Sequence, residues 1–134
     1  MGMLTFDQAS KVIKSGNIVL LRTELDAGLS PNLANKYSWT LFMLAALRGN
    51  TCIGRLLIER GAEVGRTNMF QQTASLLAAC QGNISFVRML RAAGASLEPD
   101  QRSKLEPWLR LFYHLPEVKI KKLLSLLEIE ENHT

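Results

Sequence analysis

Residues 36–68 read KYSWTLFMLAALRGNTCIGRLLIERGAEVGRTN, and this stretch gives the period of the chain. The dipeptide Gly-Asn occurs three times at intervals of 33 residues: Gly16-Asn17, Gly49-Asn50 and Gly82-Asn83. A further glycine recurs at the same interval: Gly28, Gly61 and Gly94. A period of this length is typical of arrays in which each small unit buries its apolar face against its neighbours. The sequence therefore predicts a repeat protein.

Each unit is predicted to contain two helices joined by a tight turn. In the second unit Thr40 is a suitable N-cap, because its hydroxyl can accept a hydrogen bond from a free amide of the first turn. Gly49 is expected to end this helix at Arg48, since glycine adopts the left-handed conformation without steric cost. Asn50 can then cap a second helix that ends near Arg60.

The same plan applies to the other units, with changes at the two ends. Thr73 caps the third unit, and Asp7 occupies the corresponding position in the first. In the fourth unit Glu106-Pro107 is predicted to open the first helix, where the missing amide of proline does no harm. Leu115-Pro116 replaces the Gly-Asn turn.

Small side chains recur where neighbouring helices must approach closely. The paired alanines at 45–46 and 78–79 fit an interaxial distance of about 8–10 Å. They are replaced by Val12-Ile13 in the first unit and by Leu111-Phe112 in the fourth. We expect Phe112 and Trp108 to be core or capping residues.

The second helices become polar at the ends of the array. The residue equivalent to Ile53 is still apolar in the first unit, where it is Leu20, but it is Lys119 in the fourth unit. The residue equivalent to Leu57 is Glu24 in the first unit. This predicts that the Ile53 class faces the following unit and the Leu57 class the preceding one. The first and last units would then be caps of a complete array of four.

Composition favours a folded intracellular protein, in the cytoplasm, the nucleus or both. The chain has 134 residues, 47% apolar content and a net charge of +4. No apolar run reaches the roughly 20 residues that span a bilayer, and the polar start predicts no export signal. Cys52 and Cys80 lie at different points of their units, which suits a reducing compartment.

Catalysis and metal binding are not predicted. His114 and His133 have no ligand spacing with the two cysteines, and a structural zinc site needs about four ligands. No histidine follows Cys80 at a helical interval, so an inert, partly buried thiol is expected. The sequence has no phosphate-binding Gly-Lys-Ser/Thr motif. We therefore expect no cofactor, no metal and no enzymatic activity.

Residues 40–62 resemble the ankyrin repeat family, which has a threonine, paired alanines, Gly-Asn or Gly-His, an apolar helix and Gly-Ala in this order. Residues 73–95 resemble it next best. The Pro-Leu-His part of the family pattern reads Leu41-Phe42-Met43 and Ala74-Ser75-Leu76 here, so the inter-repeat histidine bonding of the family is absent. Apolar packing is expected to substitute for it.

The resemblance implies one all-α domain over residues 1–134, an α-solenoid of helix-turn-helix units with extended hairpin-like loops. The units would be about 5–36, 37–69, 70–102 and 103–130. The loops would form a row of fingers beside the first helices and, with them, a concave surface that binds a partner protein. Carried over to this chain, that surface comprises Lys36, Tyr37, Trp39, Leu47, Arg48, Met69, Phe70, Gln72, Cys80, Gln81, Arg102, Ser103, Leu105, Tyr113 and His114.

Three functions are compatible with these residues. The favoured one is an adaptor or inhibitor that uses the loop aromatics, since exposed aromatic residues supply much of the affinity at interfaces. The second is a binder of nucleic acid or acidic surfaces, which would use a C-terminal basic cluster comprising Arg102, Lys104, Arg110, Lys119, Lys121 and Lys122. The third is a scaffold, monomeric by itself, that self-associates through a Trp39–Phe70 patch. A solvated cap explains the C-terminal basic cluster better than phosphate binding, so nucleic acid is not the expected partner, and neither is a membrane.

Overall fold

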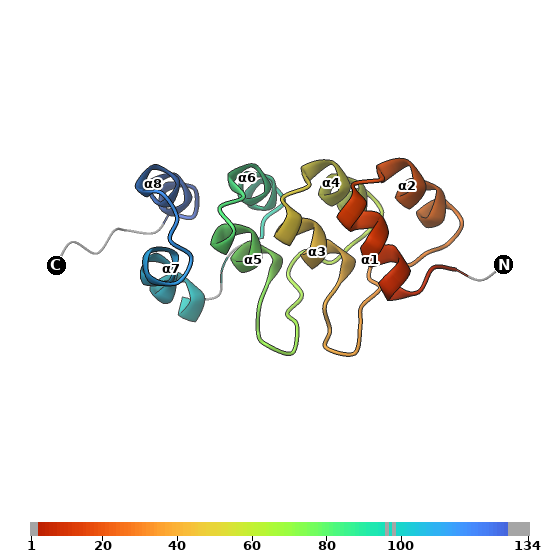
Figure 1. Cartoon of the computed structure of the whole chain (residues 1–134), viewed down its shortest axis with the longest axis horizontal. Helices are drawn as coiled ribbons and strands as arrows, with labels where there is room; N and C mark the ends of the chain where they lie inside the picture. The colour runs from red at the N-terminus through yellow and green to blue at the C-terminus, as the bar shows by residue number, and fades with distance from the viewer. Residues whose placement is uncertain (1–2, 96, 98, 129–134) are drawn as a thin grey trace.

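The computed structural model describes residues 3–95, 97 and 99–128, and these residues contain eight helices. They are α1 (Phe6–Ser15), α2 (Ile18–Asp26), α3 (Leu41–Arg48), α4 (Thr51–Glu59), α5 (Ala74–Cys80), α6 (Ile84–Ala92), α7 (Pro99–Leu111) and α8 (Glu117–Leu126). The described residues form no strand, only an isolated bridge between Ala34 and Thr40. Figure 1 shows four helix pairs in a row, with α1, α3, α5 and α7 in one layer and α2, α4, α6 and α8 in the other.

The helix starts predicted by the period are confirmed in the two central units. The hydroxyl of Thr40 accepts a hydrogen bond from the Met43 amide at 3.1 Å, and Thr73 caps α5 in the same way. In the first unit the prediction is wrong, because Thr5 and not Asp7 is the N-cap. Thr5 and Gln8 form a reciprocal capping box, which satisfies two amides at once and starts α1 earlier than the period predicts.

The Gly-Asn turns end one helix and begin the next, as predicted. Gly49 has φ 71°, and the side chain of Asn50 caps α4. Asn83 differs, since its side chain makes no cap hydrogen bond to α6. Its amide nitrogen donates instead to the carbonyls of Ala46 at 2.9 Å and Leu47 at 3.2 Å. This side chain therefore ties the third unit to the end of α3.

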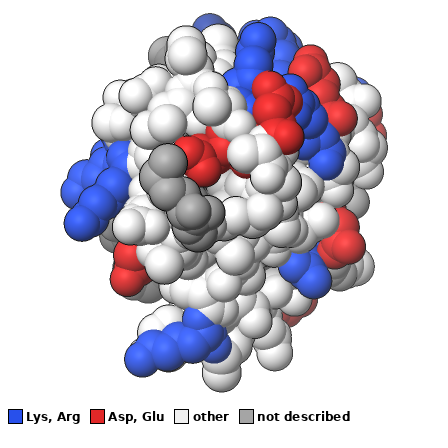
Figure 2. All heavy atoms as spheres, turned by 90° about the vertical axis from the view of Figure 1, so that its right-hand side faces the viewer, with Lys and Arg blue, Asp and Glu red and all other residues white. Residues whose placement is uncertain are grey.

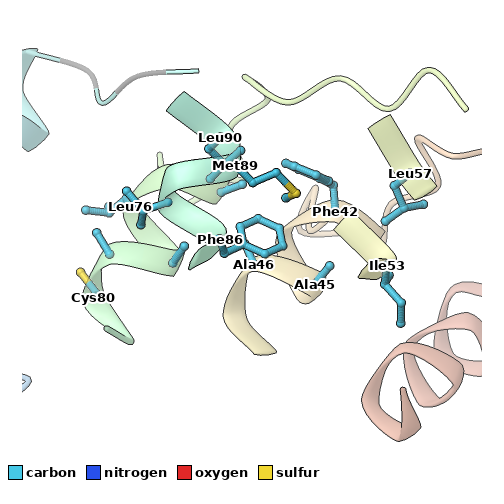
Figure 3. Packing of buried hydrophobic residues seen from close by; sticks show 14 of the residues in the cluster. Phe42, Ala45, Ala46, Ile53, Leu57, Leu76, Cys80, Phe86, Met89 and Leu90 are labelled. Atoms are coloured by element: carbon cyan, nitrogen blue, oxygen red, sulfur yellow. The ribbon is translucent and has the colours of Figure 1, made fainter. Parts of the chain in front are cut away.

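The paired alanines are fully buried, as predicted, and lie beside a core that joins successive units. The rings of Phe42 and Phe86 lie 5.5 Å apart, and Figure 3 shows them in one packed region with Met89. A Cβ added to Gly54 would lie 2.7 Å from both Phe86 and Met89. The absence of a side chain on α4 thus makes room for α6.

The predicted facing of the Ile53 class is wrong. Phe86, its member on α6, reaches back to Gly54 in the preceding unit. Leu20, the member on α2, has a following unit to pack against but is 38% exposed. The class therefore faces the preceding unit, and Leu20 is exposed because no described unit precedes it.

The fourth unit departs most from the period. Its first helix, α7, begins at Pro99, so Glu106-Pro107 lies inside the helix and does not open it. Leu105 and Leu109 form the buried face of α7, while Leu111 and Phe112 are 65% and 70% exposed. The predicted core roles of Leu111 and Phe112 are therefore wrong.

The turn between α7 and α8 lies where the period places the Gly-Asn turn, but it is made of different residues. Leu115-Pro116 precedes α8, as predicted. The left-handed residue is His114, with φ 49°, one position before the site of the glycine in the other units. Non-glycine residues adopt this conformation at some cost.

Candidate functional site

The layer formed by α1, α3, α5 and α7 is here called the inner layer, and the other the outer layer. Two loops project beyond the inner layer on the same side of the array (Figure 1). The first finger, residues 33–39, is shaped by Asn35. Its side-chain oxygen accepts hydrogen bonds from the amides of Tyr37 at 2.9 Å and Trp39 at 3.0 Å. Ser38 adopts a left-handed conformation at the tip, with φ 63°.

The second finger, residues 66–72, repeats this construction 33 residues later. The side-chain oxygen of Asn68 accepts from the amides of Phe70 at 2.9 Å and Gln72 at 3.1 Å, and Gln71 has φ 60°. Asparagine favours such turns because its short side chain bonds to the backbone two residues on. The 33-residue interval between Asn35 and Asn68 was the sequence signal for this shared tip.

The two fingers support each other and present aromatic side chains to solvent. The amide of Met69 donates to the Tyr37 carbonyl at 2.9 Å, and the rings of Tyr37 and Phe70 lie 6.2 Å apart. The Lys36 ammonium lies 5.1 Å from the centre of the Tyr37 ring. Met69 and Phe70 are 65% and 62% exposed, whereas Trp39 is only partly exposed. The exposed apolar patch is therefore centred on Phe70.

The predicted third finger does not form, because α7 occupies its place. Leu105 is fully buried and cannot contribute to a binding surface. Arg102 donates to the Glu128 carbonyl at 2.9 Å, and Ser103 is exposed on the same helix. Gln101 holds α7 against the second finger, since its side-chain amide donates to the Gln71 carbonyl at 2.7 Å.

A cavity of about 830 Å³ lies between α5, α7 and the second finger. Its size is in the range of ligand-binding pockets, and aromatic side chains make up much of its wall. It is lined by Thr67, Phe70, Gln71, Gln72, Leu76, Leu77, Cys80, Gln81, Asp100, Gln101, Trp108, Phe112 and Tyr113. The structure thus brings together five of the predicted surface residues, namely Phe70, Gln72, Cys80, Gln81 and Tyr113.

Sequence reasoning missed the contribution of α7 to this cavity. Trp108 and Phe112 are predicted to be core or capping residues. Trp108 is partly buried against the core, as predicted, whereas Phe112 is exposed, and both line the cavity because α7 buries Leu105 and Leu109. Residues 99–104 do carry helix signals: a proline at the first position and an Asp100–Lys104 pair one turn apart. These signals could have located the start of α7.

Cys80 and Tyr113 form an uncharged part of the cavity wall. The thiol of Cys80 is almost fully buried, and this burial raises its pKa to about 11, although a hydrogen bond with Tyr113 lowers it in part. The pKa of Tyr113 is raised by burial and by the neighbouring thiol. Both groups are neutral near pH 7, as predicted for an inert thiol.

A family model described as ankyrin repeats, in three copies, matches residues 9–101. The chain belongs to the ankyrin repeat family. No curated protein sequence matches it. The matched part of this ankyrin repeat protein ends at Gln101, near the start of α7, which is where the structure departs from the 33-residue period.

The remaining predicted surface residues of this ankyrin array lie outside the cavity. Leu47 is partly exposed at the end of α3, and Arg48 is exposed beside it. His114 is exposed in the turn that follows α7. These three residues do not line the cavity between α5 and α7.

Within the described residues, two of the six members of the C-terminal basic cluster are paired with acidic side chains. Lys104 lies 3.1 Å from Asp100, and Arg110 bonds to both Glu106 and Glu117. The hydrogen bond with Arg110 lowers the pKa of Glu117. These pairs neutralise charge that a phosphate-binding surface would need.

The part of the ankyrin chain that the structure describes holds no group of three or more metal-ligating side chains, and His133 lies outside it. None of its helices is long and apolar enough to cross a membrane.

Proposed function

We propose that this chain is a non-enzymatic adaptor or inhibitor that binds a partner protein through the concave surface of its fingers and inner helices. Ankyrin repeats are generally protein–protein interaction modules, and the chain belongs to that family. The observation that carries the proposal is the cavity between α5, α7 and the second finger, because it offers a large aromatic recess beside exposed fingertips.

The chemistry of the cavity supports protein recognition. Phe70 on the second finger and Phe112 near the end of the α7 segment both line it and are exposed, and Trp108 and Tyr113 add aromatic surface. Aromatic side chains in such positions contribute most of the binding energy at interfaces. Side-chain amides among the lining residues, such as Gln81, can hydrogen-bond to a partner backbone.

Site-specific photocrosslinking tests this proposal. A benzophenone amino acid replaces Phe112 at the cavity or, as a matched control, Val19 on the outer helix α2, which is 72% exposed. After irradiation in an extract of the source cells, the Phe112 position should yield a discrete crosslinked protein, identified by mass spectrometry. When the chain that carries benzophenone at position 112 also carries Phe70→Ala, the yield of this crosslinked product should fall. Equal crosslinking from Val19, or a product from Val19 alone, would contradict the assignment of the surface.

A further inference from the structure

The cavity is one end of a longer strip that crosses three inner helices. On α5 the cavity is lined by Leu76, Leu77, Cys80 and Gln81. The period places their counterparts on α3 at Met43, Leu44, Leu47 and Arg48, and on α1 at Ser10, Lys11, Lys14 and Ser15. Met43 is buried, but the other three positions on α3 and all four on α1 are at least partly exposed. Because α3 packs between α1 and α5, these exposed positions continue the cavity wall along the inner helices as one surface, here called the concave strip.

The far end of the concave strip is basic. Lys11, Lys14 and Arg48 are exposed, and none of them forms an ion pair with a carboxylate of the described residues. Lys36, on the first finger, is a further exposed positive residue. The one carboxylate of α1 is Asp7, in its first turn.

Charge is distributed differently elsewhere on the molecule. Figure 2 shows the N-terminal end, where positive and negative residues interleave at the upper right and separate positive residues stand at the left and lower left. At the cavity end of the strip the one charged lining residue is Asp100, which is paired with Lys104. The strip thus changes from unpaired positive charge to neutral aromatic surface.

We infer that the concave strip receives an extended peptide segment of the partner, with acidic side chains over Lys11, Lys14 and Arg48 and a bulky apolar side chain in the cavity. This inference rests on the proposed function and specifies the partner's chemistry. Complementary charge accelerates association and fixes the register of the bound segment. Burial of a large apolar side chain in the aromatic cavity stabilises the complex, because it removes apolar surface from water.

The geometry of the stack sets the spacing in the peptide. Packed helices lie about 8–10 Å apart, so α1 and α5 are separated by roughly 20 Å. An extended chain covers at most about 3.3–3.6 Å per residue. The acidic positions over α1 should therefore lie about six residues from the apolar position, and the acidic position over Arg48 on α3 about three residues from it.

Selection from a phage-displayed library of random peptides, panned against the full chain, tests this inference. Enriched peptides should combine acidic residues and a bulky apolar residue at this spacing, in either direction, and added salt should weaken their binding. In the variant K11E/K14E/R48E a selected peptide should lose about tenfold or more in affinity, because like charges then face each other. Selection against that variant should enrich lysine and arginine instead.

The outer helices provide the matched control. Arg55 and Arg88 are exposed on α4 and α6 at equivalent repeat positions and form no ion pair within the described residues. The variant R55E/R88E should bind the selected peptides as the unmodified chain does. Circular dichroism should show the same helicity for both variants, so that a loss of binding is not a loss of fold.

Five results would overturn the inference, and the first four concern the selected peptides. These four are enrichment of peptides without acidic residues, unchanged affinity in K11E/K14E/R48E, an equal loss in R55E/R88E, and displacement of the selected peptide by a single-stranded oligonucleotide. Failure to enrich any peptide would also overturn it. If Phe112 still crosslinks to a protein in that case, the proposed function stands and the partner presents a folded surface.

Discussion

At the scale of single residues, Gly49 shows how the turn and the packing between units are coupled. Its φ of 71° is left-handed, and an added Cβ would lie 2.8 Å from the Asn83 side chain. Gly61 has a similar conformation, with φ 92°, but nothing lies within 4 Å of its added Cβ. Substitutions at Gly61 and Gly49 can therefore be compared: the first measures the cost of the left-handed backbone alone, and the second adds the cost of the clash with Asn83 in the next unit.

Gly61→Ala should lower the free energy of unfolding by about 1–2 kcal/mol, the cost of a left-handed side-chain-bearing residue. Gly49→Ala should cost roughly 1–2 kcal/mol more, because it displaces Asn83 from the carbonyls of Ala46 and Leu47. Urea unfolding measures both values. In an Asn83→Ala background the extra cost of Gly49→Ala should disappear, and persistence of the difference there would contradict this explanation.

At the scale of elements, α7 replaces a third finger and is held in place by Gln101. The Gln101 side chain is buried, and its amide donates to the Gln71 carbonyl at 2.7 Å. This contact fixes the second finger relative to α7 and so maintains the width of the cavity. Ser103, on the same helix, is exposed, and its hydroxyl bonds locally to the Asp100 carbonyl.

Gln101→Leu should reduce the free energy of unfolding by about 1–3 kcal/mol, because the Gln71 carbonyl loses its donor and the buried Thr73 hydroxyl loses its acceptor. Ser103→Ala, the control on the same helix, should change it by less than about 0.5 kcal/mol. Both are measured by urea unfolding. Equal effects of the two substitutions would show that Gln101 does not anchor α7.

The elements also show how far the sequence alone could predict this fold and its surface. The interval between Gly49 and Gly82 predicts the helices of the central units, since each turn needs a left-handed residue at that point. It could not predict where α7 begins, because the period assigns residues 101–105 to a loop while burial of Leu105 favours a helix. The cavity was missed for the same reason, as its far wall belongs to α7.

At the scale of the whole molecule, the stacked units place one continuous surface along the inner helices. The surface is basic over α1 and α3 and aromatic between α5 and α7, where α7 takes the place of a third finger. Binding at this surface is the central claim. The chain's two cysteines can report on it, since Cys80 lines the cavity and Cys52 is exposed on the outer helix α4.

The most direct test is the rate of alkylation of each cysteine by iodoacetamide, followed by mass spectrometry. In the free protein Cys80 should react far more slowly than Cys52, and faster as the pH approaches about 11, because burial raises the pKa of its thiol. Addition of a selected peptide, or of the partner protein identified by photocrosslinking, should slow the alkylation of Cys80 further and leave the alkylation rate of Cys52 unchanged. Protection of Cys52, with Cys80 reacting as in the free protein, would contradict binding at the concave surface.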